Sequence, residues 1–289
     1  MIVVPGPSSP RLGRGVAEIL GAKVIPVEYK NFPDGESYVR VAGGVRGEDV
    51  VLIQTTYPQP DKRLIELLLL IDALRDLEAA SIRVVAPYMA YARQDTRFRE
   101  GEAVSIKTLF RTIEGAGCDE FYTIDLHKEF SLEAFSVKAK NIYASEAIAS
   151  HLKGMGLREP YIISPDKGAI NIAKRVADLL GAEYGHFEKT RDRITGAISV
   201  KGERMEVKGR PVIITDDLIS TGGTIANAAR LVKEAGGGQV VAVCTHPLLV
   251  AGAYDKMKGS GVDEVLGTDT IEGDISKISV ASLIAREFK

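Results

Sequence analysis

The sequence is poor in the residue types that mark several classes of protein. It contains two cysteines, no tryptophan and four histidines among 289 residues. The two cysteines, Cys118 and Cys244, lie far apart. Their number and separation exclude both a disulfide framework and the close ligand spacing of a zinc site. Such cysteine usage favours a reducing compartment.

A charge excess of one sign and a long apolar run are also missing. Lysine and arginine number 37 and the acids 39, giving a formal net charge of −2, which provides no general attraction to nucleic acid or anionic membrane. The N-terminus lacks the basic start and apolar core of a signal peptide. The most apolar helical pattern, residues 64–77, is interrupted by charges such as Glu66 and cannot span a bilayer. We expect a cytoplasmic protein that binds neither nucleic acid nor membrane.

Short apolar segments alternate with amphipathic helical patterns along most of the chain. The segments expected as buried strands are residues 2–5, 50–54, 83–87, 120–125, 161–164, 212–215 and 240–245. The segments expected as helices are 61–77, 105–114, 145–152, 168–180, 224–234 and 276–288. Ser105 and Ser276 resemble N-caps, and Gly181 resembles a helix stop. The alternation predicts an α/β fold with parallel sheets covered on both faces.

The two halves of the sequence repeat one arrangement. Residues 49–58 (DVVLIQTTYP) hold an apolar strand that ends in hydroxyl residues, and a long helix and a second strand follow. Residues 211–222 (PVIITDDLISTG) begin the same succession. The similar spacing predicts two related α/β domains, residues 1–142 and 143–289, although no linker rich in proline or glycine marks the boundary.

The strongest local pattern lies at residues 212–224 (VIITDDLISTGGT). An apolar strand runs into Asp216 and Asp217, and a Ser/Thr/Gly turn then opens a helix. Glycines let backbone N–H groups converge, and the helix N-terminus adds partial positive charge, so a phosphate fits the turn. Carboxylates at the carboxyl end of a strand can hold ribose hydroxyls or a cation. An acidic helix start with a flexible turn is the alternative, but the whole constellation favours a binding site.

Three other segments carry polar residues in suggestive places. Residues 31–37 (NFPDGES) contain a Pro-Asp-Gly turn, which alone indicates only a hairpin loop. Residues 87–97 (PYMAYARQDTR) follow an expected strand; arginine and tyrosine there suit a polyphosphate and an adenine ring, but a solvated basic loop has the same composition. Asp125 and His127 flank one apolar residue at another strand end, so both can face one cleft.

Two further segments have open interpretations. Residues 164–168 (SPDKG) follow an apolar strand and open a helix, as an anion- or metal-binding turn does and as a plain helix cap does. Residues 189–193 (KTRDR) form a polar stretch between two short strand patterns. A stretch of this kind is usually a solvated hairpin. The residues alone decide neither case.

The turn at residues 216–224 resembles the phosphoribosyl-binding signature shared by type I phosphoribosyltransferases and phosphoribosyl pyrophosphate synthetases. Together with the FPDGE, YARQD and DLHK segments, the sequence resembles the synthetases, the ribose-phosphate pyrophosphokinases, over nearly its whole length. The resemblance implies two phosphoribosyltransferase-like domains, the first on the nucleotide side and the second holding ribose 5-phosphate. It also implies transfer of the pyrophosphoryl group of Mg-ATP to the C1 hydroxyl of ribose 5-phosphate, giving 5-phosphoribosyl 1-pyrophosphate and AMP for nucleotide biosynthesis.

The same resemblance assigns residues to these sites. Those matching the catalytic cations of the family's mobile loop are Lys189 and Arg191. Those matching the ATP site are Phe32, Asp34, Glu36, Arg93, Gln94, Asp95 and His127. Those matching the ribose 5-phosphate site are Asp216, Asp217, Ser220, Thr221, Gly222, Gly223 and Thr224. His127 and Asp166 match residues that contact Mg²⁺. The FPDGE loop serves a neighbouring subunit in the family, which implies a homo-oligomer of at least two subunits.

Two segments depart from the family pattern: Thr96 and Arg97 replace a basic pair, and residues 128–130 replace a glutamine-rich stretch. Two alternative functions follow from the same residues. A type I phosphoribosyltransferase would use the same ribose turn but leaves FPDGE, YARQD and the first domain unexplained. A non-catalytic regulatory paralogue would tend to lose His127 or the loop cations, which this chain retains.

Overall fold

The computed structural model of the protein describes residues 1–191, 198–202 and 207–289. The chain forms two units: Met1–Tyr143 with Asp269–Gly273 and Ser279–Lys289, and Ala144–Thr268 with Asp274–Ile278. The last residues therefore belong to the first unit, whereas the sequence predicts that everything after residue 142 lies in the second domain. The physical reason is that helix α8 (Ala281–Arg286) packs its apolar side chains against helix α1 (Pro10–Leu20).

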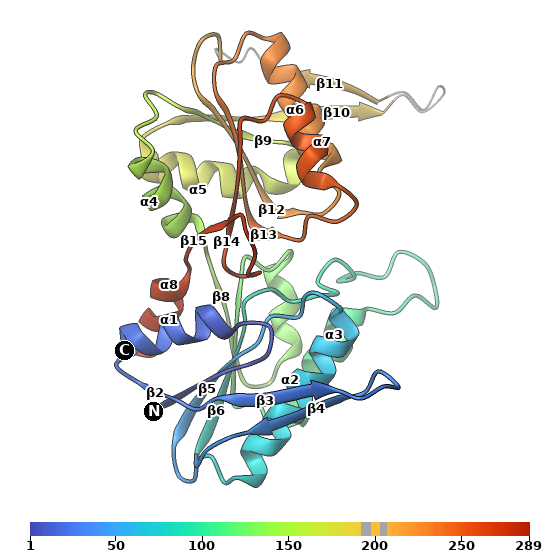
Figure 1. Ribbon diagram of the computed structural model, residues 1–289. Coiled ribbons are helices and arrows are strands. Elements are labelled where there is room, and N and C mark those ends of the chain that lie inside the picture. Colours follow the sequence, from blue (N-terminus) through green and yellow to red (C-terminus); the bar gives the residue numbers. More distant parts are fainter. Residues whose placement is uncertain (192–197, 203–206) are drawn as a thin grey trace. The chain divides into compact units, whose positions relative to one another are not determined.

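A parallel sheet with strand order β2-β1-β5-β6-β7-β8 forms the centre of the first unit (Figure 1). Its strands are β1 (Ile2–Pro5), β2 (Lys23–Val24), β5 (Asp49–Ile53), β6 (Ser81–Ala86), β7 (Glu120–Ile124) and β8 (Lys138–Ile142). Helices α2 (Pro60–Asp76) and α3 (Ser105–Gly115) cover one face, and α1 and α8 lie on the other. A separate two-stranded hairpin, β3 (Val27–Asn31) and β4 (Ser37–Val41), and the short 3₁₀ helix η1 (Glu129–Ala134) complete the unit.

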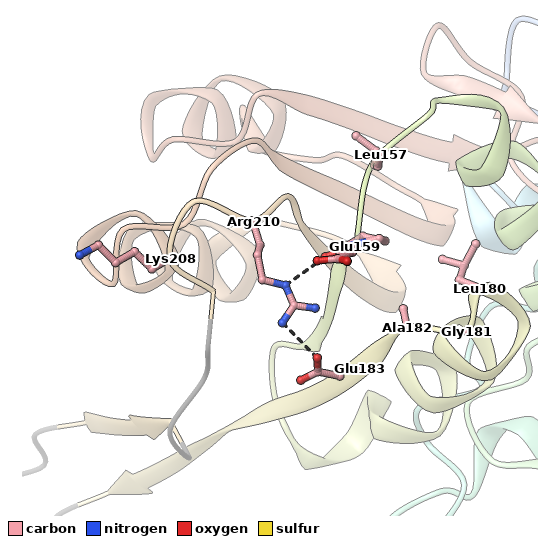
Figure 2. Close-up of a pocket in the computed structure, with 9 residues that line it drawn as sticks. Leu157, Glu159, Leu180, Gly181, Ala182, Glu183, Lys208 and Arg210 are labelled. Carbon is pink, nitrogen blue, oxygen red and sulfur yellow. Dashed lines mark hydrogen bonds and ion pairs between the residues drawn. The ribbon is translucent and has the colours of Figure 1, made fainter.

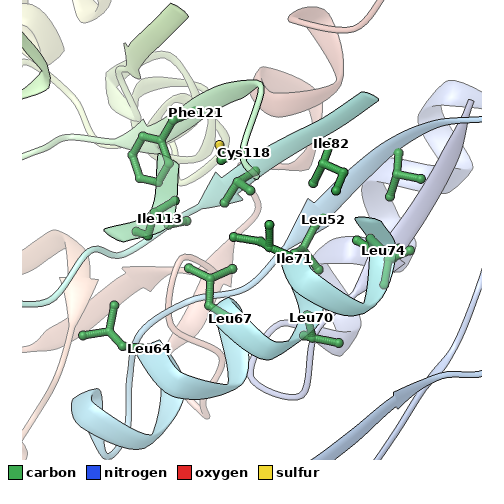
Figure 3. Packing of buried hydrophobic residues seen from close by; sticks show 14 of the residues in the cluster. Leu52, Leu64, Leu67, Leu70, Ile71, Leu74, Ile82, Ile113, Cys118 and Phe121 are labelled. Atoms are coloured by element: carbon green, nitrogen blue, oxygen red, sulfur yellow. The ribbon is translucent and has the colours of Figure 1, made fainter. Parts of the chain in front are cut away.

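Apolar side chains of α2 fix this helix against the sheet of the first unit (Figure 3). Leu67, Leu70 and Leu74 pack in one cluster with Leu52 of β5 and Ile82 of β6, and all five are fully buried. Burying such a side chain stabilises a fold by about 1.5–3 kcal/mol, and truncating a buried leucine to alanine costs about 2–5 kcal/mol. The start of α2 is thereby held near the carboxyl end of β5, which precedes it.

The second unit contains a sheet with strand order β11-β10-β9-β12-β13-β14-β15 in the described part of the chain. The strands are β9 (Tyr161–Ser164), β10 (Glu183–Arg191), β11 (Ile198–Gly202), β12 (Val212–Ile219), β13 (Val240–Pro247), β14 (Glu264–Thr268) and β15 (Ser276–Ile278). Among the described strands of this sheet, only the β10–β11 pair is antiparallel. Helices α4 (Ser145–Gly154) and α5 (Ile170–Leu180), preceded by the 3₁₀ helix η2 (Lys167–Ala169), cover one face; α6 (Gly223–Glu234) and α7 (Ala253–Gly259) cover the other.

The two units repeat one topology. The order β2-β1-β5-β6-β7-β8 of the first unit is matched by β10-β9-β12-β13-β14-β15 of the second. In both units the helix after the central strand, α2 after β5 and α6 after β12, packs on the sheet. The prediction of two related α/β domains with mainly parallel sheets is therefore confirmed.

Some local predictions are wrong. Ser276 does not cap a helix; it begins β15, which pairs with β14, and the helix starts only at Ala281. Ser105 is not an N-cap either, since the cap position is Val104 and the Ser105 hydroxyl donates to Gln94. In both cases, tertiary partners outweigh the local pattern. Gly181, in contrast, ends α5 with a left-handed φ of 67°, as predicted.

Both cysteines are buried free thiols, consistent with the absence of a disulfide framework. Burial raises the pKa of the Cys118 thiol to about 12, so it is neutral and unreactive at physiological pH. Across the described ranges, no helix combines the length and the apolar character needed to cross a membrane.

Candidate active site

The acid pair lies in the second half of β12, beyond the point where its neighbour β9 ends. Strand β9 pairs with β12 only as far as Ile214, whereas β13 accompanies β12 to Ile219. The predicted strand, residues 212–215, is therefore too short, and Asp216 and Asp217 belong to the strand itself. Both are half-buried at the carboxyl end of a parallel sheet, which is where open α/β folds bind ligands.

The acid pair is electrostatically strained. Burial raises the pKa of Asp216 well above its ordinary value, and the carboxylates of Asp217 and Asp166 raise it further. The backbone N–H of Asp217 donates to Asp216 Oδ1 at 2.9 Å, which offsets part of this effect. A ligand that brings hydroxyl donors or a cation to these carboxylates would relieve the repulsion.

The turn after β12 has the geometry of an anion site. Gly222 has a φ of 68°, and a Cβ there would lie 3.0 Å from the carbonyl oxygen of Ala253, so only glycine fits without displacement. Within residues 207–289, no side chain caps the start of α6 and its first turn holds no acid. The backbone N–H groups at this helix end are thus available with their partial positive charge.

The turn is also anchored from the loop after β13. The carbonyl of Ser220 accepts from the backbone N–H of Val250 at 3.0 Å. The carbonyl of Thr221 accepts from Lys256 Nζ, also at 3.0 Å, which brings a cation to the turn. Thr221 is exposed and Thr224 is half-buried. The turn is therefore a fixed, accessible and locally positive segment, suited to a monophosphate.

For residues 164–168 the sequence leaves open a plain helix cap and an anion- or metal-binding turn, and Asp166 has features of both. Its Oδ1 accepts from the backbone N–H of Gly168 at 2.8 Å, so it caps η2. The Ser164 hydroxyl donates to the Asp166 carbonyl and tightens the same turn. The carboxylate also acts on the pKa of Asp216. It is thus a helix cap that contributes negative charge to the acid pair.

Sequence reasoning missed Cys244, which lies beside the acid pair. It is the register partner of Asp216 on β13 and is fully buried. Burial raises the pKa of its thiol well above the ordinary value, and the charge of Asp216 adds to the effect. On this side, the site is therefore lined by a small, uncharged side chain. No sequence signal could have found it, because cross-strand neighbours follow only from the register.

In the first unit, residues 87–95 and 125–127 follow the adjacent strands β6 and β7. Because these strands are parallel, their carboxyl ends lie at one edge of the sheet. Arg93 and Gln94 are exposed there, while Asp95 is 8% exposed. Asp125 has a φ of 39°, which is rare for a residue with a side chain and is typical of constrained functional turns. His127 follows this turn and is exposed.

The predicted loop of residues 32–36 forms the tip of the β3–β4 hairpin. Phe32, Asp34 and Glu36 are all exposed. The tip closes on itself: the N–H of Phe32 donates to the carbonyl of Glu36 at 2.8 Å, and the N–H of Glu36 donates to Asp34 Oδ1 at 3.2 Å. Among the described residues, no hydrogen bond or ion pair joins this tip to residues 93–95, so the structure of one chain does not connect these two parts of the expected ATP site.

The expected catalytic cations lie on the β10–β11 hairpin. In the backbone register, Lys189 is opposite Val200 and Arg191 is opposite Ile198. Their side chains, and the rest of the expected mobile loop at residues 192–197, lie outside the described residues. Their catalytic role stays a prediction.

Across residues 1–191, 198–202 and 207–289, no group of three or more His, Cys, Asp or Glu side chains could hold a metal ion. Magnesium is usually bound by one or two carboxylates together with substrate phosphates and water. Asp166, close enough to Asp216 to affect its pKa, fits such a partial donor set.

A pocket of the second unit lies at the opposite ends of the strands (Figure 2). Within its lining, Arg210 donates to the carbonyl of Glu159 at 3.0 Å and to Glu183 Oε1 at 3.1 Å. Glu159 precedes β9 and Glu183 begins β10, so the pocket is at the amino ends of these strands. It is separate from the acid pair at the carboxyl end of β12.

The second unit, with the acid pair and the glycine turn at the carboxyl end of its central strand, has the architecture of a phosphoribosyltransferase-type domain. Residues 138–280 match the phosphoribosyl transferase domain, and residues 1–117 match the N-terminal domain of ribose phosphate pyrophosphokinase. The chain belongs to the ribose-phosphate pyrophosphokinase family, which places it among the enzymes that transfer diphosphate groups.

The likeness extends over the whole chain. The ribose-phosphate pyrophosphokinase of Methanothermobacter thermautotrophicus is 42% identical over 282 residues, covering 98% of both chains. That of Saccharolobus solfataricus is 41% identical over 290 residues, covering 99% of both. The crystal structure of phosphoribosylpyrophosphate synthetase from Mycobacterium smegmatis superposes with a TM-score of 0.87 at 30% identity, covering 99% of this chain and 96% of that one.

Proposed function

We propose that the protein transfers the pyrophosphoryl group of Mg-ATP to the C1 hydroxyl of ribose 5-phosphate, giving 5-phosphoribosyl 1-pyrophosphate and AMP. The observation that carries the proposal is the anion turn and acid pair at the end of β12, in a chain that is similar to ribose-phosphate pyrophosphokinases over its full length.

In this proposal the second unit binds ribose 5-phosphate. The 5-phosphate binds to backbone and hydroxyl groups at the uncapped start of α6, because the N–H groups there are available to an anion. These groups belong to Ser220, Thr221, Gly222, Gly223 and Thr224. Asp216 and Asp217 accept hydrogen bonds from the ribose hydroxyls. Such donors stabilise the charged carboxylates and so offset the repulsion that raises the pKa of Asp216 in the ligand-free protein.

The first unit binds ATP. Phe32 offers an exposed aromatic ring for the base, with Asp34 and Glu36 as acceptors for the ribose. Arg93 and Gln94 offer exposed donors for the nucleotide. Asp95, the next residue in this segment, also lines the nucleotide site in this proposal. His127 faces the phosphates.

Magnesium, when bound, neutralises charge on the ATP phosphates. We assign His127 and Asp166 as its protein contacts, by resemblance to the family. Asp166 is the better supported of the two, because its carboxylate already contributes to the negative field at Asp216.

In the chemical step the C1 hydroxyl oxygen attacks the β-phosphorus of ATP. A new O–P bond forms, the bond from the β-phosphorus to the α–β bridging oxygen breaks, AMP leaves and the hydroxyl proton passes to solvent. Negative charge grows on the bridging and equatorial oxygens, so positioning and cations supply most of the rate. Lys189 and Arg191 are the cations we assign to this charge, each worth on the order of 10²–10³ in rate.

We further propose that the active protein is a homo-oligomer of at least two subunits, with the 32–36 loop serving the ATP site of its neighbour. Exposed apolar side chains on α2 and β3 support an interface on the first unit. Ile65 and Leu69 lie one helical turn apart and are 53% and 40% exposed, and Tyr29 is 55% exposed.

The proposal is tested by incubating the protein with ATP, ribose 5-phosphate and Mg²⁺ and no nucleobase, with ³¹P NMR as the readout. AMP and 5-phosphoribosyl 1-pyrophosphate should appear in equal amounts. Formation of ADP would show transfer of the γ-phosphoryl group instead. The absence of any product would contradict the proposal, and activity only with 5-phosphoribosyl 1-pyrophosphate and a base would indicate a phosphoribosyltransferase.

A further inference from the structure

The hairpin that carries residues 32–36 depends on support from outside itself. Strands β3 and β4 form a two-stranded sheet that is separate from the main sheet, and an isolated pair of strands is at best marginally stable in water. The last cross-strand pair before the tip is Asn31 with Ser37. The position of the tip is therefore set by whatever holds these two residues.

Helix α2 bonds both members of this pair. Lys62 Nζ donates to Asn31 Oδ1, and the Ser37 hydroxyl donates to Glu66 Oε1 at 3.0 Å. Lys62 and Glu66 are four residues apart and so lie on one face of the helix. Asn31 and Ser37 point to the same side of the hairpin because they are directly paired. The two stems of the tip are thus joined to consecutive turns of one helix.

The carboxylate of Glu66 has an unusual environment for a charged group. It is 1% exposed, on the apolar side of α2 between buried leucines. Arg63 Nη1 donates to its Oε2 at 2.7 Å, and Gln54 Nε2 lies 3.5 Å from the same oxygen. Burying a carboxylate costs several kcal/mol, which pairing repays only in part. An apolar side chain at this position would stabilise the core more. The carboxylate therefore indicates that this residue holds its hydrogen-bond partners in position.

The same end of α2 also contacts the second segment assigned to the nucleotide. The Tyr91 hydroxyl donates to Asp61 Oδ1, in the first turn of the helix. Tyr91 has a φ of 63°, so its backbone is held in a conformation that few side chains adopt. Two segments far apart in the sequence are therefore anchored on one rigid helix end, which the leucine core fixes to the sheet.

We infer that Lys62 and Glu66 are positioning residues for the nucleotide: they hold the 32–36 tip by both stems in its binding geometry. This inference rests on the proposed function for its ligand. The strands of the hairpin pack on the core through Val27, Val39 and Val41. The tip has no described hydrogen bond to the 93–95 segment, so these two bonds are the ones that fix its orientation. Removing the two bonds should therefore weaken the binding of ATP and leave the binding of ribose 5-phosphate unchanged.

The test is the double variant Ser37→Ala with Lys62→Met, which removes both bonds and leaves the buried Glu66–Arg63 pair in place. We expect the KM for ATP to rise about 9- to 25-fold, at roughly three- to fivefold per bond, while kcat and the KM for ribose 5-phosphate change less than twofold. The single variant Ser37→Thr keeps the hydroxyl and should keep most of the ATP affinity. Arg40→Met removes the ion pair with Glu28 on the other face of the same hairpin and should leave the KM for ATP unchanged.

Hydrogen exchange separates this inference from the proposed function. The amides of Phe32 and Glu36 should exchange at least fivefold faster in the double variant than in the wild type, with no change at the leucines of α2. Unchanged exchange, an unchanged KM for ATP, or an equal rise in both KM values would each overturn the inference. A wild-type protein that forms no AMP would refute the proposed function instead, and the exchange result would still decide whether α2 anchors the tip.

Discussion

The two sheets share one strand order, yet the ends of their central strands differ. The second half of β12 carries two acids and leads into an open glycine turn, and Asp216 is electrostatically strained. After β5 come Gln54, Thr55 and Thr56, all fully buried. The same topological position is thus a ligand site in our proposal for the second unit and a structural joint in the first.

The hydroxyls after β5 are used by the protein itself. Thr56 Oγ1 accepts from the N–H of Ala90 at 2.6 Å and donates to the carbonyl of Tyr88 at 2.8 Å. Thr55 Oγ1 accepts from the N–H of Tyr88 at 3.0 Å and donates to the carbonyl of Thr270. These bonds fix the start of the 87–95 segment, so the threonines position a loop and have little capacity left for a phosphate.

The helix starts differ in the same sense. Helix α2 has Asp61 in its first turn, whereas α6 follows the N-cap Gly222 and has no acid in its first turn. A carboxylate at the positive end of a helix dipole repels an incoming anion, while an uncapped end attracts it. The fold thus supplies the position of a site, and a few side chains at the helix start decide whether an anion can occupy it.

The largest effect should come from neutralising the acid pair. Asp216→Asn with Asp217→Asn removes two charged acceptors for the ribose hydroxyls, each worth about 1.5–3 kcal/mol. We expect kcat/KM for ribose 5-phosphate to fall by about 10²–10⁴, mainly through KM. Steady-state kinetics at saturating ATP measure this, and an unchanged KM would remove the acids from the ribose site.

Thr56→Val is the matched variant in the first unit. It leaves the N–H of Ala90 without its acceptor and removes one of two hydrogen bonds to the carbonyl of Tyr88, which keeps the backbone N–H of Thr56 at 3.0 Å. The loss should cost about 1–3 kcal/mol of stability. The KM for ribose 5-phosphate should stay within twofold of the wild-type value. A large change in that KM would mean that the two strand ends are not functionally distinct.

The two hairpins offer the second contrast. Lys189→Ala should lower kcat about 10²–10³-fold with little change in the KM for ATP, because the cation acts on transition-state charge. Phe32→Ala on the β3–β4 hairpin should instead raise the KM for ATP. Single-turnover kinetics with labelled ATP distinguish the two, and a near-normal rate for Lys189→Ala would exclude its catalytic role.

The glycine turn gives a smaller effect. Gly222→Ala combines a positive φ of 68° with a Cβ only 3.0 Å from the Ala253 carbonyl, whereas Gly181→Ala has nearly the same φ and open space. We expect Gly181→Ala to cost about 1 kcal/mol and Gly222→Ala roughly 2–3 kcal/mol. Thermal unfolding measures both. Equal losses would show that the turn is not closely packed.

The smallest effect is a pH dependence of the ligand-free protein. Because the pKa of Asp216 is raised in the folded state, this state keeps a proton that the unfolded chain has already lost. The associated stability is fully present below the unfolded pKa of about 3.9 and is lost as pH rises through the folded value. Asp216→Asn should therefore raise the Tm of the ligand-free protein at pH 7, more than at pH 4. A Tm that does not change at either pH would contradict the raised pKa of Asp216 in the folded protein.

Much of the fold was predictable because local sequence patterns determine most of its strands and helices. The apolar runs at β5, β6, β9 and β13 identify a parallel α/β architecture, and the 212–224 pattern identifies the acid pair and the glycine turn that opens α6. The β15 strand was not predictable, since Ser276 looks like a helix cap until its pairing with β14 is known. The packing of α8 with the first unit likewise depends on contacts remote in sequence.

The candidate site was predictable in part. The residues of the turn and the acids are contiguous in sequence, so their juxtaposition needs no tertiary information. Cys244 and the bonds from α2 to Asn31 and Ser37 depend on register and packing. Glu66 did leave a signal, a charge on the leucine-rich face of α2, but from sequence it reads only as an interruption of an apolar run.

The most direct measurement is a crystal structure of the protein with ribose 5-phosphate. The account predicts the 5-phosphate at the backbone N–H groups of residues 220–224 and the ribose hydroxyls within hydrogen-bond distance of Asp216 and Asp217. A sugar phosphate bound at the end of β5, or a turn at the start of α6 that remains empty at saturating ligand, would contradict it.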